Sequence, residues 1–573
     1  PVSVRVLVLV KDTSTSMLKL MGAGTLSGSA TVNTGTLALA NNAALGTTLV
    51  PITVASGAVI DLQNVTLTGG SISINGGTIS ASTGGNTLSG GVSLNADSYL
   101  NVAGTSLTVS GAVTGNSHGL ILSGQGIVSL SNPSNTVSSL NTTGSVGKIS
   151  LYNSTPLSIQ VISSSGDVNV FNSSGITLLS GQGITSTNGN IVLTATKFYD
   201  YAGTTGLNVS GSNYWQVWDS NPDPYGLTQG NTPDNLASLL NNYVQYNATY
   251  GSTSPQGTGN GILYSYSPSV QVTIQGTITK TYDGNSSIPG VALNNIVSAT
   301  GFKNNDAATL ITTAGSFVKN GVAVTDIGND YTISISTSFG SSTVVASNVN
   351  GANQPTIVYG YRLTNATTQG VQASITQLPV AVWIGPASGG NWSDASNWAP
   401  QNSTTPGAIP SGANVAVAMI PASVTGKVVA DNAGSVNSNY QGKIVVKGGA
   451  LSVASDSYLG TSAQADSITL DGGALELSAN LTINTSRGIT LGVGGGTLLV
   501  DPSVSVSYGG IIAGSGTLYK TGSGSINLGS NNSYTGGTVI NGGAVVTSSA
   551  YALGTNSAVS LSNSSGAALQ LNS

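Results

Sequence analysis

Short apolar triplets, separated by clusters of glycine and asparagine, run through most of this 573-residue chain. In each triplet two aliphatic side chains flank a small polar residue, as in Ile72-Ser73-Ile74, Leu107-Thr108-Val109 and Val168-Asn169-Val170. Such alternation places the aliphatic side chains on one face of a β-strand. Helix signals are scarce, because Gly, Asn, Ser and Thr, which favour turns, interrupt every window. The pattern predicts an all-β protein built from very short strands.

The triplets recur with a loose period of about 20 residues, which is typical of a solenoid. We expect a right-handed parallel β-helix over residues 1–197 and a second β-solenoid over residues 381–573. In such a fold each coil stacks about 4.8 Å from the last, with its aliphatic side chains inside. Only 6% of the residues are charged. This fits stacked coils, where like charges placed above one another repel, whereas Asn, Ser and Thr form hydrogen-bonded ladders.

Residues 198–267 differ from the flanking solenoid because aromatic residues crowd into them. We expect one short helix at 233–244, where Thr232 can cap, Pro233 suits the first position and apolar residues follow at spacings of three and four. The aromatic residues are predicted to form a cap that seals the open end of the solenoid. The alternative is a surface on which Trp215, Trp218 and Tyr214 stack against a glycan.

Residues 268–380 contain longer strands with stronger alternation, for example at Tyr331–Ile335 and Ile357–Leu363. This pattern favours a small antiparallel β-sandwich between the two solenoids.

Three motifs between residues 280 and 543 resemble known families or motifs that accompany them. Lys280-Thr281-Tyr282-Asp283-Gly284-Asn285 is similar to the opening of the YDG domain, which is found in large bacterial surface proteins of the filamentous-haemagglutinin type. Residues 516–543, with Tyr534, Gly536 and Gly537, resemble the autotransporter-associated β-strand repeat. Gly389 to Trp398, with Trp392, resembles a motif that often opens such solenoid regions.

These resemblances imply a secreted β-helical exoprotein of bacteria, exported by a type V route through an outer-membrane transporter. Such proteins act as adhesins, biofilm components or fibres at the cell surface. The chain begins with Pro1, and we expect it to be a segment of something longer. We expect structural roles for the residues that these motifs share. They are Tyr282, Asp283 and Gly284 of the YDG motif, Trp392 and Trp398, and Tyr534, Gly536 and Gly537 of the repeat.

The composition excludes several kinds of chemistry. There is no cysteine and one histidine, so thiolate catalysis, iron–sulfur clusters and Cys- or His-pair metal sites are ruled out. Fourteen scattered Lys and Arg residues do not make the basic face that binds nucleic acid. No apolar run reaches the roughly 18 residues of a membrane span. We therefore expect no enzyme activity, no cofactor, no nucleic acid and no membrane span.

The acidic residues offer two weak candidate sites. Asp219 and Asp223, close in sequence to Trp215 and Trp218, form the best carboxylate cluster. Acids next to Gly, Asn and Pro, however, are usually turn residues. Asp326, Asn329 and Asp330 offer oxygen ligands of the kind calcium prefers, although the repeat of calcium-binding β-rolls is absent. His118 lies in a turn with no acid close to it in sequence, and is expected to be a solvated residue.

Three functions remain open. The favoured hypothesis is a non-enzymatic adhesin or structural fibre that associates with itself or with host or matrix glycans and proteins. The alternatives are a glycan-binding or glycan-cleaving module centred on residues 198–266, and a surface-layer subunit.

Overall fold

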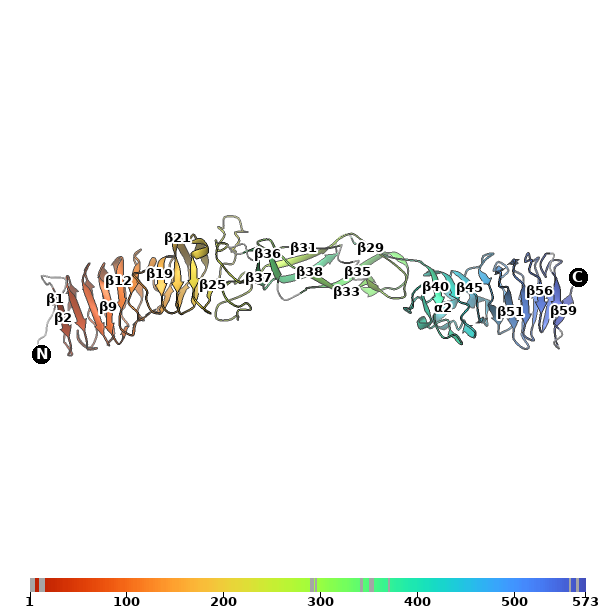
Figure 1. The fold of residues 1–573 in the computed structure, drawn as a ribbon, viewed down its shortest axis with the longest axis horizontal. Helices are drawn as coiled ribbons and strands as arrows, with labels where there is room; N and C mark the ends of the chain where they lie inside the picture. Colours follow the sequence, from red (N-terminus) through yellow and green to blue (C-terminus); the bar gives the residue numbers. More distant parts are fainter. Residues whose placement is uncertain are drawn as a thin grey trace. The chain divides into compact units, whose positions relative to one another are not determined.

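The computed structural model describes residues 6–9, 16–288, 293, 296–340, 344–349, 355–368, 371–555, 558–562 and 566–572. The chain divides into two compact units. Unit 1 comprises Pro1–Val272, Ala299–Ile311 and Ser338–Asn365, and unit 2 comprises Thr273–Ser298, Thr312–Thr337 and Ala366–Ser573. Nearly all regular structure is β (Figure 1), which confirms the predicted all-β class.

Unit 1 contains a solenoid of stacked parallel coils with three sheets (Figure 1). The first sheet contains β1 (Val6–Leu9), β3 (Ser29–Val32), β5 (Ile52–Val54), β8 (Ser71–Asn75), β11 (Gly91–Ala96) and β14 (Val113–Thr114). The second contains β2 (Met17–Leu20), β4 (Thr36–Leu39), β6 (Val59–Gln63), β9 (Thr78–Thr83), β12 (Ser98–Val102), β15 (Leu120–Ser123), β17 (Ser139–Thr142), β19 (Leu157–Ser164), β21 (Gly175–Ser186) and β23 (Lys197–Asp200), with β24 (Leu207–Val209) also paired to β21. The third contains β7 (Thr66–Leu67), β10 (Gly85–Leu88), β13 (Ser106–Val109), β16 (Ile127–Leu130), β18 (Ile149–Asn153), β20 (Val168–Asn172), β22 (Ile191–Ala195), β25 (Trp215–Asp219), β27 (Gly261–Tyr264), β26 (Tyr243–Gln245), β37 (Pro355–Tyr359), β36 (Val344–Val349) and β32 (Asp306–Ala307).

The strand register matches the predicted period. Ile52 pairs with Ile72, and Ile72 with Val92, so each coil brings an aliphatic side chain above the previous one. These side chains are buried and form one continuous core. The solenoid of stacked parallel coils is thereby confirmed, while its right-handed sense stays a prediction.

Polar ladders and close glycine contacts replace charge at the corners of the coils. The amides of Asn153 and Asn172 are buried, and each donates to the carbonyl of Thr155. A Cβ on Gly90 would lie 2.1 Å from the carbonyl oxygen of Gly70, and one on Gly111 would lie 2.1 Å from that of Gly90. Glycine at this corner therefore lets successive coils approach, because no side chain fits between them.

The helix predicted at 233–244 is wrong. Asn235 forms an isolated parallel bridge with Tyr199, and Tyr243 begins β26, which pairs with both β27 and β37. Leu236 and Leu239, which suggested a helical face, are instead buried in the solenoid core. Tertiary packing and pairing with distant strands have overridden the local spacing.

The segment 268–380, predicted as one sandwich, is shared between the two units. In unit 1, β36 pairs antiparallel with β32 and β37. Most of this segment's strands in unit 2 form one sheet. It contains β29 (Thr277–Thr281), β39 (Gln372–Thr376), β35 (Gly328–Phe339), β33 (Leu310–Lys319) and β30 (Ser287–Ile288), with β34 (Val322–Ala323) also paired to β33. Their pairings are mixed, since β35 is antiparallel to β39 whereas β29 is parallel to it. The chain passes between the units within β28 (Ser269–Ile274), β31 (Val297–Thr300), β33, β35 and β38 (Arg362–Thr368). A separate YDG-like sandwich stays a prediction.

Unit 2 contains the second parallel solenoid (Figure 1). Its first sheet contains β42 (Trp398–Pro400), β40 (Leu378–Trp383), β43 (Val415–Ile420), β45 (Lys443–Val446), β47 (Ile468–Leu470), β50 (Ile489–Leu491) and β53 (Ile512–Gly514). Its second contains β41 (Gly389–Asn391), β44 (Lys427–Val429), β46 (Ala450–Val453), β48 (Ala474–Leu477), β51 (Gly496–Val500), β54 (Leu518–Thr521), β56 (Thr538–Ile540) and β58 (Val559–Leu561). The third contains β49 (Leu481–Ile483), β52 (Ser505–Tyr508), β55 (Ser525–Leu528), β57 (Ala544–Thr547) and β59 (Ala568–Leu571). The described short helices are η1 (Gly203–Thr205), η2 (Ala395–Asn397), η3 (Ala433–Ser435), α2 (Val436–Asn439) and η4 (Asp456–Leu459).

Candidate functional site at the aromatic end of unit 1

The two candidate tryptophans lie in the interior of unit 1. Trp215 is 1% exposed and pairs through β25 with Ile191 of β22. Trp218 is 5% exposed, donates from Nε1 to Gln216 Oε1 at 3.1 Å, and packs edge-on against Tyr250. Tyr214 is half-buried beside them. Because both indole rings are covered, the idea that they stack on a glycan is wrong, and their positions agree with filling of the solenoid end.

Asp219 is buried and lies near the half-buried Asp234. Asp219 is 1% exposed; its Oδ1 accepts from the backbone N–H of Asn221, while its Oδ2 has no partner in the described structure. Burial, and after it the proximity of the Asp234 carboxylate, raise the pKa of Asp219 far above its usual range. Asp234 accepts from the backbone N–H of Phe198 and from the amide of Asn221. The raised pKa favours the neutral form of Asp219, and its hydrogen bond with Asn221 ties β25 to the following loop.

Asp223 has a separate, structural role. Its carboxylate accepts from the backbone N–H groups of Leu227 and Thr228, both at 2.8 Å, and from the Asn231 amide at 3.0 Å. These hydrogen bonds, led by the one from Asn231, lower the pKa of Asp223 to about 2. The turn chemistry expected for this residue is confirmed, and the two acids act in different networks.

A cluster of tyrosines surrounds a third acid, Asp306, in the same unit. The Tyr361 hydroxyl donates to Asp306 Oδ2 at 2.7 Å, and the rings of Tyr246 and Tyr361 lie 4.9 Å apart. Burial raises the pKa of Asp306 to about 6, and the tyrosine hydrogen bonds oppose this. A cavity of about 240 Å³ lies against Tyr246, Tyr264 and Asp306. Sequence reasoning missed this cluster because Asp306 and Tyr361 come from segments that the fold brings back to the solenoid end.

The residues proposed as calcium ligands point to different partners. Asp326 accepts from the Asn414 amide at 2.8 Å, and Asp330 forms a 2.7 Å ion pair with Lys319. Asn329 is exposed. Among the described residues, no three His, Asp or Glu side chains group closely enough to hold a metal ion.

His118 has an acid neighbour that the sequence did not indicate. Its Nδ1 lies 3.8 Å from Asp97 Oδ1, and both side chains are exposed. Asp97 precedes His118 by about one coil, so a period of about 20 residues was the signal that could have found the pair.

The motif residues of unit 2 form packed corners. Lys280 Nζ contacts Asp283 Oδ1 at 2.6 Å, and the Tyr282 hydroxyl donates to the Ile409 carbonyl at 3.1 Å. A Cβ on Gly284, whose φ is +82°, would lie 1.8 Å from the Gly407 carbonyl oxygen. The expected structural corner is therefore present.

The tryptophan and repeat residues are equally buried. Trp392 and Trp398 are 1% and 0% exposed, and their rings lie 4.7 Å apart. The Tyr534 hydroxyl is 2.6 Å from Thr538 Oγ1. A Cβ on Gly536 would lie 2.3 Å from the Gly516 carbonyl carbon, and Gly537 has a φ of +88°. These contacts agree with the structural roles expected for these residues.

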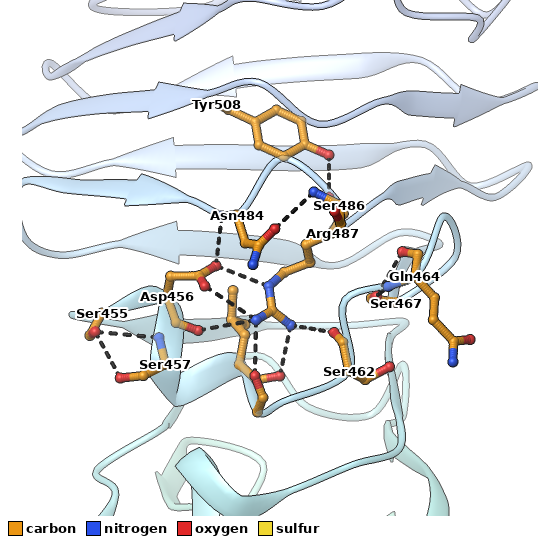
Figure 2. A network of polar contacts seen from close by, with 12 residues as sticks. Ser455, Asp456, Ser457, Ser462, Gln464, Ser467, Asn484, Ser486, Arg487 and Tyr508 are labelled. Atoms are coloured by element: carbon orange, nitrogen blue, oxygen red, sulfur yellow. Dashed lines mark hydrogen bonds and ion pairs between the residues drawn. The ribbon is translucent and has the colours of Figure 1, made fainter.

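A buried arginine joins two coils of unit 2 (Figure 2). Arg487 is 2% exposed; its Nε donates to Asp456 Oδ1 at 2.9 Å, and its guanidinium also donates to the carbonyls of Leu459, Gly460 and Ser462. The Tyr508 hydroxyl donates to the Arg487 carbonyl at 2.8 Å. The Arg487 guanidinium is thus paired with a carboxylate and with backbone carbonyls at η4 and the turn after it. Such pairing offsets the cost of removing a charged group from water.

The stacked parallel coils of both units define a β-solenoid protein. Within the described ranges, no helix is long and apolar enough to cross a membrane. No protein-family model matches the chain, and no solved structure matches it.

Part of the chain is similar to a curated protein, the autotransporter adhesin BmaC of Brucella suis biovar 1 (strain 1330). The two are 38% identical over 144 residues, which are 24% of this chain and 4% of that adhesin. This partial similarity and the solenoid fold agree with the autotransporter-type exoprotein that the sequence motifs indicate.

Proposed function

We propose that this chain is a segment of a secreted bacterial surface protein that acts as an adhesin or structural fibre. The observation that carries the proposal is the 38% identity over 144 residues to an autotransporter adhesin. The long stacks of parallel coils support it, because a stiff solenoid presents a long polar surface on which many weak contacts multiply. Host or matrix glycans and proteins, further copies of the chain, and an outer-membrane transporter during export are the partners we propose.

The proposed protein has no catalytic activity, no cofactor and no bound metal. The state of its candidate acids supports this, because Asp219 is buried and Asp223 is fully engaged in its turn. A hydrolase instead needs two carboxyl groups that reach the substrate. We also propose that residues 268–380 form the YDG-like sandwich.

Adhesion of beads coated with the full chain to epithelial cells tests the function. We expect saturable attachment that soluble chain competes away, and no attachment of beads coated with heat-unfolded chain. Absence of attachment to cells, matrix proteins and biofilm polysaccharide alike would contradict an adhesive role.

The lack of catalysis is tested separately. Incubation of the chain with polysaccharides is expected to release no reducing ends above background. A cleavage rate that disappears in Asp219→Asn or Asp223→Asn would contradict the proposal.

A further inference from the structure

A row of aromatic rings crosses the outer face of unit 1. The aromatic residues between positions 16 and 197 are Tyr99, Tyr152 and Phe171. Tyr152 and Phe171 occupy paired positions in β18 and β20, with ring centroids 4.6 Å apart. Tyr250 adds a third ring, 5.4 Å from Phe171. Tyr152 and Tyr250 are 39% and 47% exposed, so this row presents aromatic surface to solvent.

A surface cavity of about 240 Å³ lies beside this aromatic row. Pro133, Tyr152, Phe171, Ser173 and Thr194 contribute to its lining. The row therefore flanks a hollow that also offers hydroxyl groups from Tyr152, Ser173 and Thr194. Apolar rings beside a few polar groups are the usual composition of a small-molecule site.

The charge of this region specifies the kind of ligand. Between residues 119 and 196 the charged residues are Lys148 and Asp167, and they neutralise each other in a 2.9 Å ion pair. No charged side chain lines the cavity. A surface of rings and hydroxyls without net charge is complementary to an uncharged, hydroxyl-rich ligand, because burying an unpaired ligand charge there would be costly.

We propose that this aromatic row and its cavity bind a linear, uncharged glycan that runs along the coil axis. The C–H faces of sugar rings pack on aromatic surfaces while their hydroxyl groups exchange hydrogen bonds with Ser, Thr and Tyr. Coils repeat at about 4.8 Å, close to the length that one sugar residue adds to an extended chain, so successive sugars meet successive coils. The inference rests on the proposed adhesive function and names its ligand class.

Affinity electrophoresis of the full chain in gels containing dextran, galactomannan or xyloglucan tests the proposal. We expect retardation in at least one of these neutral polymers and none in heparin or polygalacturonate. Replacing both rings, by Tyr152→Ala with Phe171→Ala, should weaken binding about tenfold or more. Tyr152→Phe, which keeps the ring, should retain most of the affinity.

Tyr99→Ala provides the matched control, because Tyr99 is 41% exposed on β12 and stands outside the row. It should bind as the unaltered chain does, and circular dichroism should show that every variant keeps its β structure. No retardation in any neutral polymer, preferential binding of the acidic polymers, or equal binding by the double variant would overturn the glycan site. If such a chain still attached to cells, the adhesive function would stand while this inference failed; without attachment, both fail.

Discussion

Lys520 shows how a single charged residue is accommodated in a solenoid core. It lies in β54 at an inward position, in register with Leu498 and Ile540 of the adjacent coils, and is 1% exposed. Its ammonium donates to the carbonyls of Thr521, Gly522, Gly524 and Gly542 at 2.9–3.1 Å. Burial lowers the pKa of Lys520 to about 8. The four carbonyl acceptors oppose this shift, because they stabilise the charged ammonium. The side chain thus closes two turns of neighbouring coils at once.

Replacing this lysine tests that role. Lys520→Met keeps the length and the apolar stem but leaves carbonyls of both turns unpaired, so it should destabilise unit 2 by about 2–4 kcal/mol. Denaturant unfolding measures the change. Lys447→Met, at an exposed position of the same unit, should stay within about 0.5 kcal/mol, and an equal effect of the two substitutions would contradict the account.

The position of Lys520 could be predicted from the sequence, but its partners could not. Leu518-Tyr519-Lys520-Thr521 alternates in burial, which places the lysine inside together with Leu518. Its acceptor carbonyls lie in the turn that follows β54 and in the corresponding turn of the next coil. The conformation of these turns depends on φ values that the residue types do not determine. Arg487 was hidden for the same reason, since three of its acceptors are backbone carbonyls.

At the scale of elements, the sequence predicted strands well and the aromatic segment poorly. Triplets such as Ile72-Ser73-Ile74 have a period of two that matches β8, and their burial is a local consequence of that period. Leu236, Leu239 and Tyr243 also showed a regular spacing, yet β26 pairs with β37, more than a hundred residues away. Such long-range pairing has no local signal, so the helix prediction failed there.

Asp306 in β32 should give the aromatic end of unit 1 a dependence on pH. The pKa of Asp306 is about 6 in the folded chain, against 3.8 in the unfolded chain. Since the folded state binds the proton more tightly, this stabilisation is fully present below pH 3.8 and is lost as pH rises through about 6. Allowing for partial exposure, we expect about 1–2 kcal/mol.

Asp306→Asn, which cannot ionise, should therefore reduce the loss of unit 1 stability between pH 4 and pH 7. Denaturant midpoints of both proteins at the two pH values measure the difference. A pH profile of Asp306→Asn identical to that of the unaltered chain would rule out this source.

At the scale of the whole molecule, the inward positions of unit 1 repeat from coil to coil in the first and third sheets. Ile52, Ile72 and Val92 succeed one another in the first sheet, and Leu67, Leu88 and Val109 in the third. Removing residues 72–91 would bring Ile52 beside Val92 and Leu67 beside Val109, so every inward position is kept.

This one-coil deletion should fold, with a melting temperature within about 5 °C of the full chain, because solenoid stability is approximately a sum over neighbouring coils. Deletion of residues 72–81 removes half a coil and should abolish cooperative melting of unit 1. Calorimetry and the circular dichroism spectrum distinguish the outcomes, and equal damage by both deletions would contradict a repeating register.

The glycine contacts at Gly70, Gly90 and Gly111 have a consequence for how such a chain can evolve. Each glycine fits only against the carbonyl of the coil before it, so a newly inserted stretch must bring its own glycine to the same corner. Duplication of a whole repeat in the gene does this automatically, whereas insertion of a single codon displaces every glycine that follows within the coil. The chain can therefore change its reach in steps of about one coil, and its length becomes a heritable trait that varies by whole repeats.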